Sequence, residues 1–315
     1  MDHTLFLCVD GGGTKTEALL ADTTGNILGR GLAGGTNALS VGKNQATQSA
    51  LKAVQDALHF AGGQPVKLLH LFIPGFSQCF PLDLPMAQKL SSDSANAYYG
   101  ALGQPGGIVL LAGTGSFAVS YDAEGNQTSA GGWGAMLGDE GSGYDIGRRA
   151  VRRTLRTMDE GRPVTPLGEA VLRHYDVSQP KDLVHAIYHA GCDRQQMAAL
   201  CPVVGQWARH GDANALAIME ETAEALAQLA EILLWRLNLP GAPVALIGGV
   251  SKLGHIITTP LARRLSALGL SPQRPLYTPA VGGVIYTCGL LTGSFPSPEL
   301  AHRYHESYLK LTKEF

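Results

Sequence analysis

Short apolar runs that end in glycine-rich turns form the first clear pattern along the chain. Leu5–Val9 is an unbroken apolar run of the length expected for a buried strand, and a glycine turn follows at residues 10–16. A second apolar run, Ala18–Ala21, ends in a polar turn at residues 22–26. This order predicts two strands joined by a glycine hairpin turn and closed by a polar turn.

The same unit recurs one hundred residues further along the chain. An apolar run at Ile108–Leu111 leads into a glycine turn at residues 112–116, a strand at Phe117–Ser120 and a polar turn at residues 122–126. Identical residues at this offset are Gly13 and Gly113, Thr14 and Thr114, Asp22 and Asp122, Gly25 and Gly125, and Asn26 and Asn126. A repeat of domain size predicts a duplicated lobe rather than a solenoid of short units.

Helical patterns alternate with further strands in the rest of the chain. Asn44–Phe60 has the apolar spacing of an amphipathic helix, Ala213–Leu237 is the longest helical stretch, and Pro298–Lys313 predicts a polar helix. Apolar runs at Leu68–Ile73 and Val244–Ile247 predict two more strands. The alternation indicates an α/β protein whose sheets are flanked by helices.

Two facing glycine hairpins would suit a polyphosphate. Without a Cβ, their backbone N–H groups can approach an anion closely, and Thr14 and Thr114 would add hydroxyl donors. Ordinary hairpin turns are the simpler interpretation, which the paired arrangement disfavours. Neither turn is a P-loop or a dinucleotide fingerprint, because each leads into a strand rather than a helix.

Four other segments could carry chemistry. Asp93, just before a helix-forming run, could cap that helix or accept a proton from a hydroxyl group, and the two roles are compatible. Residues 131–143 hold six glycines around Trp133, Asp139 and Glu140, which favours a binding loop over a packed surface loop. Glycines after the strand at 244–247 could support a nucleoside. His185 and His189 have helical metal-ligand spacing but lack a third ligand.

Composition narrows the function classes. The 315 residues are long enough for two lobes, and 45% of them are apolar while 16% are charged. A net charge of −2 without a basic block gives no support to nucleic-acid binding. We expect neither a signal peptide nor a membrane span, because the longest apolar helix is interrupted by charges. Five scattered cysteines predict buried thiols in a reducing cytoplasm rather than disulfides or a cluster.

The glycine motifs together resemble the N-acetylglucosamine kinase family, in the BadF/BadG/BcrA/BcrD-type ATPase branch of the sugar-kinase, heat-shock ATPase and actin superfamily. The resemblance rests on residues 9–17, 111–116 and 131–142, and it covers roughly residues 5–290. It implies a two-lobed actin-like ATPase fold, built of duplicated ribonuclease-H-like domains with a central cleft. The expected lobes are residues 1–105, with or without the C-terminal helix 298–315, and residues 106–297.

The resemblance also implies roles for individual residues. ATP would be held by Gly12, Gly13, Thr14, Lys15, Gly113, Thr114, Gly115, Ala198, Gly248, Gly249 and Lys252. Asp10 would hold Mg²⁺ through water, and Asp93 would be the general base. The sugar would contact Thr36, Asn37, Asp93, Ser116, Phe117, Gly132, Trp133, Gly134 and Asp139.

The implied reaction is ATP-dependent phosphorylation of an amino sugar at its 6-hydroxyl, with N-acetylglucosamine as the leading substrate. Glucosamine and N-acetylmuramic acid are the alternatives, because the chain departs from vertebrate relatives at residues 74–77 and at Phe117, near the expected sugar pocket. An activator ATPase acting on a partner enzyme is a further alternative, which the cysteine positions disfavour. A homodimer follows from the resemblance alone.

Overall fold

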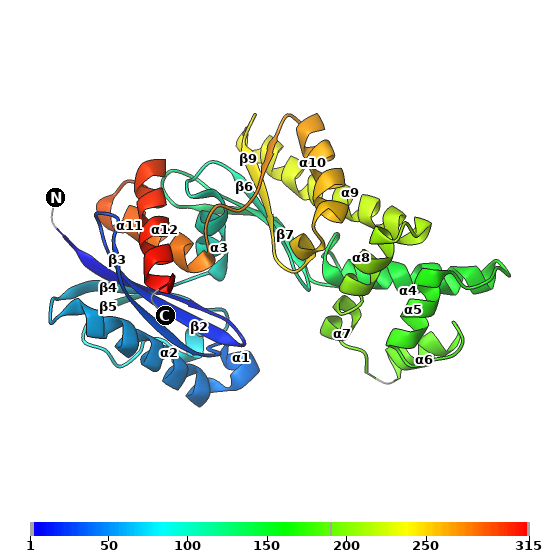
Figure 1. The fold of residues 1–315 in the computed structure, drawn as a ribbon, viewed down its shortest axis with the longest axis horizontal. Helices are drawn as coiled ribbons and strands as arrows, with labels where there is room; N and C mark the ends of the chain where they lie inside the picture. Colours follow the sequence, from blue (N-terminus) through cyan, green and yellow to red (C-terminus); the bar gives the residue numbers. More distant parts are fainter. Residues whose placement is uncertain (1–2, 190, 314–315) are drawn as a thin grey trace. The chain divides into compact units, whose positions relative to one another are not determined.

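The computed structural model describes residues 3–189 and 191–313, and the chain forms two compact units (Figure 1). The first unit combines residues 1–107, 121–127 and 275–315, and the second combines residues 108–120 and 128–274. Residues 275–297 therefore fall in the first unit, whereas the sequence analysis assigns them to the second lobe. Each unit is built around one five-stranded sheet.

The first sheet has the strand order β3-β2-β1-β4-β5. Its strands are β1 (Leu5–Gly11), β2 (Lys15–Asp22), β3 (Ile27–Gly34), β4 (Val66–Phe72) and β5 (Ala87–Ser91). β1, β2 and β3 pair in antiparallel fashion, while β4 pairs in parallel with both β1 and β5. The glycine turn therefore joins two neighbouring strands at one end of the sheet, as the sequence predicts.

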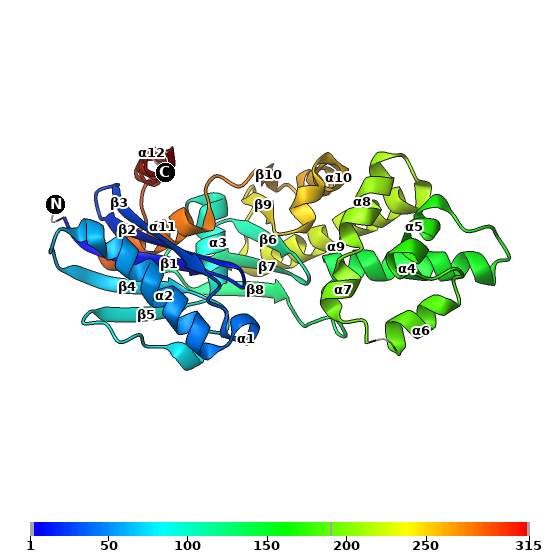
Figure 2. The same cartoon turned by 60° about the horizontal axis from the view of Figure 1, so that its bottom comes forward.

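Helices cover both faces of this sheet. Alternate residues of β1 point to opposite faces, so each face can be followed through them. Leu5, Leu7 and Val9 pack with α2 (Lys43–Leu58), which crosses one face (Figure 2). On the other face, the Cys8 thiol lies 3.1 Å from the Thr287 hydroxyl of α11 (Pro279–Thr292). α11 packs in turn on α3 (Asp93–Leu102). This packing explains why β1 is apolar throughout rather than alternating.

The second sheet repeats the topology of the first, with the order β10-β9-β6-β7-β8. Its strands are β6 (Ile108–Ala112), β7 (Ser116–Tyr121), β8 (Gln127–Gly131), β9 (Pro243–Ile247) and β10 (Ser271–Gln273). β6 pairs antiparallel with β7 and parallel with β9, as β1 does with β2 and β4. The predicted duplication is thus confirmed at the level of strand order.

The duplication extends to single hydrogen bonds. The carboxylate of Asp22 accepts from the backbone N–H of Asn26 at 3.1 Å, and that of Asp122 accepts from the N–H of Asn126 at 2.7 Å. In each turn the asparagine amide also donates to the same aspartate. These Asx turns explain why the matching residues are Asp and Asn.

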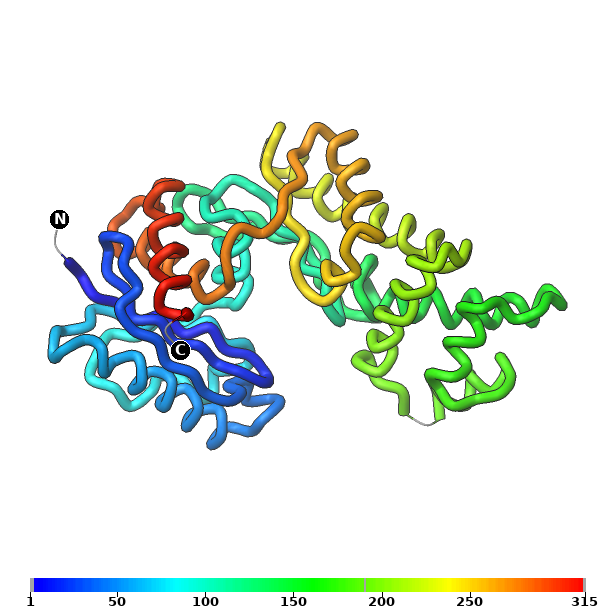
Figure 3. The backbone as a smooth tube through the Cα atoms, in the orientation of Figure 1, coloured from blue at the N-terminus to red at the C-terminus, as the bar shows by residue number. Residues whose placement is uncertain are grey.

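The remaining helices connect and cover the sheets. They are α1 (Ala38–Val41), α4 (Gly143–Asp159), α5 (Pro166–His174), α6 (Asp182–Tyr188), α7 (Arg194–Ala198), α8 (Cys201–Arg209), α9 (Ala213–Leu237), α10 (His255–Ala267) and α12 (Pro298–Lys313). Within the first unit, the backbone trace ends with α12 beside β3, where the Ile27 N–H donates to the Ser307 hydroxyl at 2.9 Å (Figure 3). None of the helices in residues 3–189 and 191–313 has the length and apolar content needed to cross a membrane.

Candidate functional site

The first glycine hairpin presents an exposed tip. The Gly12 N–H donates to the Lys15 carbonyl at 3.0 Å and closes the turn, which leaves Gly13 and Thr14 exposed. The carbonyl of Gly12 accepts from the backbone N–H groups of Thr36 and Asn37 at 2.8 and 3.0 Å. The hairpin and the segment after β3 therefore form one hydrogen-bonded structure.

Packing explains two glycines near this hairpin. A Cβ at Gly11 would lie 2.1 Å from the Thr36 hydroxyl, and one at Gly35 would lie 2.3 Å from the Gly13 carbonyl oxygen. The Thr36 side chain is fully buried, and its hydroxyl accepts from Thr16 at 2.9 Å. Thr36 thus supports the hairpin from inside. The Asn37 side chain accepts from the Leu39 N–H and caps α1.

Asp10, at the end of β1, is a partly buried carboxylate with an elevated proton affinity. Burial raises the pKa of Asp10 to about 6, and the negative charges of Glu17 and Asp93 act in the same direction. The Asn96 amide donates to Oδ1 of Asp10 at 2.7 Å, which lowers the pKa in part. A carboxylate held in this state is poised to take up a cation.

Asp93 is the first residue of α3, and Ser92 caps the helix instead. The Ser92 hydroxyl accepts from the Ser94 N–H at 3.2 Å, so the expectation that Asp93 itself could be the N-cap is wrong. Asp93 is exposed and makes no hydrogen bond or ion pair to any residue within 3–189 or 191–313. Its carboxylate is therefore free to meet a ligand in the same unit as Asp10.

The second hairpin is held from beneath by the start of α4. The Gly113 N–H donates to the Gly115 carbonyl at 2.9 Å, and the Gly113 carbonyl accepts from the Gly143 N–H at 2.7 Å. The Tyr144 N–H reaches the Thr114 carbonyl at 3.3 Å. Gly113, Thr114 and Gly115 keep partial solvent access.

Asp139 hydrogen-bonds to the second hairpin and also to Arg194, a residue that the sequence did not indicate as part of the site. Asp139 is buried at a backbone φ of 63°, and its Oδ1 accepts from the Ser116 N–H at 3.1 Å. Its other oxygen accepts from the guanidinium of Arg194 in α7. A Cβ at Gly115 would lie 2.0 Å from that guanidinium and 2.7 Å from Oδ1 of Asp139, so a larger residue there would displace this ion pair.

The tryptophan loop lies beside the same hairpin. The Gly132 N–H donates to the Ser116 carbonyl at 3.1 Å, and a Cβ at Gly132 would lie 3.3 Å from the Cβ of Phe117. Gly131, Gly132 and Gly134 all have positive φ, which explains the glycine density. The Trp133 side chain is 75% exposed, so it does not pack as a structural residue within its unit.

The expected nucleoside segments also gather at the second hairpin. A Cβ at Gly248 would lie 2.5 Å from the Ala112 carbonyl oxygen, and one at Gly249 would lie 4.0 Å from the Cα of Gly113. On the other side, a Cβ at Gly143 would touch Ala198 at 3.4 Å. Lys252 is exposed in the short helix that follows. The second unit thus places Gly113, Ala198, Gly248 and Gly249 together.

Two contributing residues escaped the sequence analysis. Asn96 lies three residues after Asp93, so helical spacing could have indicated that both share a face of α3. Arg194 carries no comparable signal, because it is distant in sequence from Asp139. His185 and His189 stack with ring centroids 5.2 Å apart, and no metal-binding group of three ligands includes them among the described residues.

The residues of the first unit fit the implied Mg²⁺. Magnesium is usually held by one or two carboxylates together with substrate phosphates and water. Asp10 offers Oδ2, which no residue within the described ranges engages, and Asp93 adds a second negative charge nearby. Asp10 would therefore hold the ion next to the first hairpin.

Comparisons with known proteins place the chain in a family. Residues 7–287 match the BadF/BadG/BcrA/BcrD ATPase family. An N-acetyl-D-glucosamine kinase of Dictyostelium discoideum is 26% identical, covering 84% of this chain and 91% of the relative. A glucosamine kinase of Vibrio cholerae is 27% identical, covering 78% of this chain and 85% of the relative.

A solved structure confirms the predicted two-lobed, actin-like α/β fold. It is a candidate N-acetylglucosamine kinase of Chromobacterium violaceum, 28% identical, with a TM-score of 0.68 over 90% of this chain and 99% of the other. The central cleft between the lobes stays a prediction. The match of residues 7–287 to the family, together with the glycine hairpins and the strand order of this chain, shows that the chain belongs to the BadF/BadG/BcrA/BcrD ATPase family.

Proposed function

We propose that this protein is an ATP-dependent sugar kinase that phosphorylates an amino sugar, N-acetylglucosamine, at its 6-hydroxyl. The observation that carries the proposal is the exposed, unpartnered carboxylate of Asp93, which lies close enough to Asp10 to raise the pKa of that group. A general base must be accessible and near the phosphate-binding residues. Kinase chemistry otherwise requires mainly positioning and charge neutralisation.

Each group has a defined task in this proposal. Backbone N–H groups of the two hairpins, with the hydroxyls of Thr14 and Thr114, hold the phosphates of ATP. Magnesium, held by Asp10, neutralises phosphate charge when it is bound. Asp93 accepts a hydrogen bond from the sugar hydroxyl and takes its proton as the new O–P bond forms. Trp133 covers the sugar ring and excludes water.

The identity of the sugar rests on the relatives, whose printed names include kinases of N-acetyl-D-glucosamine and of glucosamine. Glucosamine and N-acetylmuramic acid are therefore the alternative substrates. The activator-ATPase alternative is disfavoured, because Cys8, Cys79, Cys201 and Cys288 are buried and cannot present thiolates to a shared cluster. All five thiols are free.

The substrate assignment is tested by measuring ADP release with MgATP and a panel of amino sugars and glucose. We expect the highest kcat/KM with N-acetylglucosamine, and NMR of the product should show phosphate on the 6-oxygen. A preference for glucosamine or N-acetylmuramic acid would change the substrate and keep the kinase. ATP hydrolysis that no sugar stimulates would contradict the proposal.

Replacing Asp93 with Asn tests the general base directly. The Asp93→Asn variant should lose about 10²-fold or more in kcat, the usual scale for such a group, with little change in ATP affinity. Ser92 still caps α3, so the fold should be kept. Asp182→Asn is the matched control, because Asp182 is also the first residue of a helix. Equal turnover in both variants would reject the role of Asp93.

A further inference from the structure

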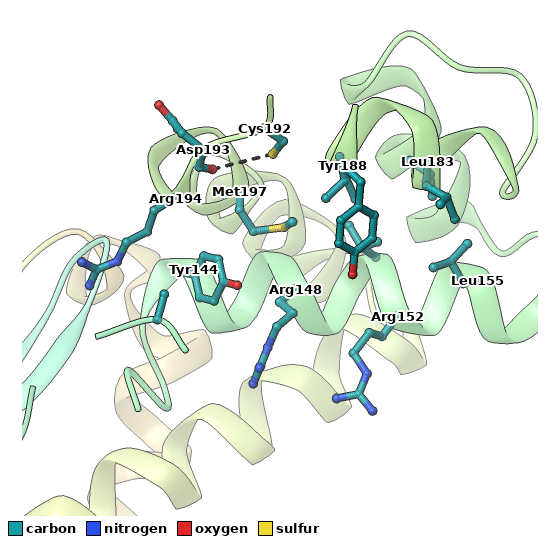
Figure 4. Close-up of a pocket in the computed structure, with 14 residues that line it drawn as sticks. Tyr144, Arg148, Arg152, Leu155, Leu183, Tyr188, Cys192, Asp193, Arg194 and Met197 are labelled. Atoms are coloured by element: carbon teal, nitrogen blue, oxygen red, sulfur yellow. Dashed lines mark hydrogen bonds between the residues drawn. The ribbon is translucent and has the colours of Figure 1, made fainter. Parts of the chain in front are cut away.

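A cavity of about 490 Å³ lies inside the second unit, between α4, α6 and α7 (Figure 4). It borders the second hairpin and the tryptophan loop, because Ala135, Tyr144 and Arg194 are among its lining residues. Its volume falls within the range of small-molecule sites. All of the lining residues come from one compact unit, so the cavity does not depend on how the two units are placed.

The cavity has an apolar floor and aromatic walls. Leu183 is fully buried and Met197 nearly so, and Leu155 of α4 completes the apolar side. The rings of Tyr144 and Tyr188 stand on either side of the opening (Figure 4). Tyr188 is 79% exposed, so its ring is accessible to a ligand. A bare sugar would leave several hydroxyl groups against apolar side chains here.

Two arginines of α4, Arg148 and the solvent-exposed Arg152, also line this cavity. Arg148 donates to Asp145 at 2.8 Å, and its guanidinium lies 5.9 Å from the centre of the Tyr144 ring. Arg152, one helical turn further along α4, has no hydrogen bond or ion pair to any residue the structure describes. Both side chains extend to the same side of α4 (Figure 4).

The other charged residues of the lining are already engaged. The carboxylate of Asp193 accepts from the Gln196 N–H at 2.8 Å in a capping box, and Arg194 binds Asp139. Neither therefore neutralises Arg152. An unpaired guanidinium beside an apolar cavity favours a ligand that supplies an anion and an apolar body together.

We propose that this cavity binds a small organic anion, in which a carboxylate or a phosphate monoester is joined to an apolar or aromatic body. The anionic group contacts the guanidinium groups of Arg152 and Arg148. The body of the ligand lies on Leu155, Leu183 and Met197, between the two tyrosine rings.

The test measures binding of simple probes to the full chain without nucleotide. Benzoate and phenyl phosphate carry the proposed chemistry with two different anions, benzamide lacks the charge, and inorganic phosphate lacks the ring. We expect one of the two aryl anions to bind, by titration calorimetry or ligand-observed NMR, at least tenfold more tightly than benzamide and inorganic phosphate. Which aryl anion binds more tightly distinguishes a carboxylate ligand from a phosphate ester. Absence of binding by both would overturn the proposal.

Two variants show where the probe binds. Arg152→Met keeps the length of the side chain and removes its charge, and it should weaken the probe about tenfold, the loss expected for one charge-assisted contact. Arg156→Met is the matched control, because Arg156 lies one turn further along α4 and pairs with Glu160 outside the cavity. Val184→Trp should fill the cavity and abolish binding. If the probe binds the parent protein and all three variants with equal affinity, it binds elsewhere, and the proposed site is refuted.

Discussion

At the scale of single residues, Asp10 is a carboxylate whose ionised form lowers the stability of the folded protein. The carboxylate is partly buried at the end of β1, near two other acids and with one amide donor from Asn96. Burial without a cation raises the pKa, which means that the folded state holds the proton more tightly than the unfolded state does. Asp10 therefore reduces stability when it is ionised, as expected of a residue kept for ligand binding.

This reasoning predicts a pH dependence in the absence of divalent cations. Because the folded pKa of about 6 exceeds the ordinary aspartate pKa of 3.8, the unfolded chain ionises first as the pH rises. The unfolding free energy of the parent protein should fall relative to Asp10→Asn between about pH 4 and pH 6, and then level off. Chemical denaturation of both proteins across this range measures the difference.

Asp10→Asn is a suitable reference because an amide oxygen can still accept from Asn96. Subtracting its stability cancels contributions from other carboxyl groups, such as Asp22, whose pKa is lowered by hydrogen bonds that outweigh its burial. A difference that does not change with pH would show that Asp10 is not buried as described.

The sequence predicts some of these residues and misses others for physical reasons. The hairpin glycines follow an apolar strand, so local pattern is enough to find them, whereas the role of Asp10 came from the family resemblance. The role of Asp93 could not be separated from capping, because Ser92 and Asp93 are both good caps. Arg194 reaches Asp139 across 55 residues of chain, and no local rule predicts such a contact.

At the scale of elements, the position of Asp93 and Asn96 depends on how closely α11 approaches α3. Gly282 of α11 and Gly100 of α3 allow the two backbones to meet. A Cβ at Gly282 would lie 2.0 Å from the Asn96 carbonyl oxygen and 2.1 Å from the Gly100 nitrogen. The sequence predicts α3 approximately, but the glycines of α11 reveal their purpose only when the two helices are seen together.

Gly282→Ala should destabilise the protein by at least about 3 kcal/mol, or prevent folding, because backbone atoms cannot move aside. Gly283→Ala is the matched comparison on the same helix, where the added Cβ would meet the buried Phe72 ring at 3.0 Å instead of backbone atoms. There the higher helix propensity of alanine, about 1 kcal/mol, offsets the contact. Thermal denaturation of the two variants should separate them clearly, and similar stabilities would disprove the close packing.

At the scale of the whole molecule, the duplication is the feature that the sequence revealed best. Two glycine hairpins and two polar turns at a constant offset predicted a duplicated lobe, and the structure has two sheets of the same strand order, each with an Asx turn. The return of residues 275–313 to the first unit was harder to foresee. The sequence analysis left room for the C-terminal helix, α12, to join the first lobe. It gave no such indication for α11, whose residues are mostly buried and have the pattern of an ordinary core helix.

The division into units predicts unequal behaviour of fragments. A fragment of residues 108–274 contains every residue of the second unit and should fold cooperatively, as judged by circular dichroism and resistance to proteolysis. A fragment of residues 1–274 should give the same protected core, with the first 107 residues digested. Protection of those residues without α11 and α12 would show that the first sheet is stable alone.

The arrangement of α11 and α12 sets an order of events during synthesis. The first sheet emerges from the ribosome early, yet the side of β1 that carries Cys8 is covered by α11, which is made more than 260 residues later. The second unit is complete before that helix appears. The first unit, whose strand β1 is made early, therefore completes its fold after the second unit, and Asp10 and Asp93 lie in a finished unit only once α11 has been made.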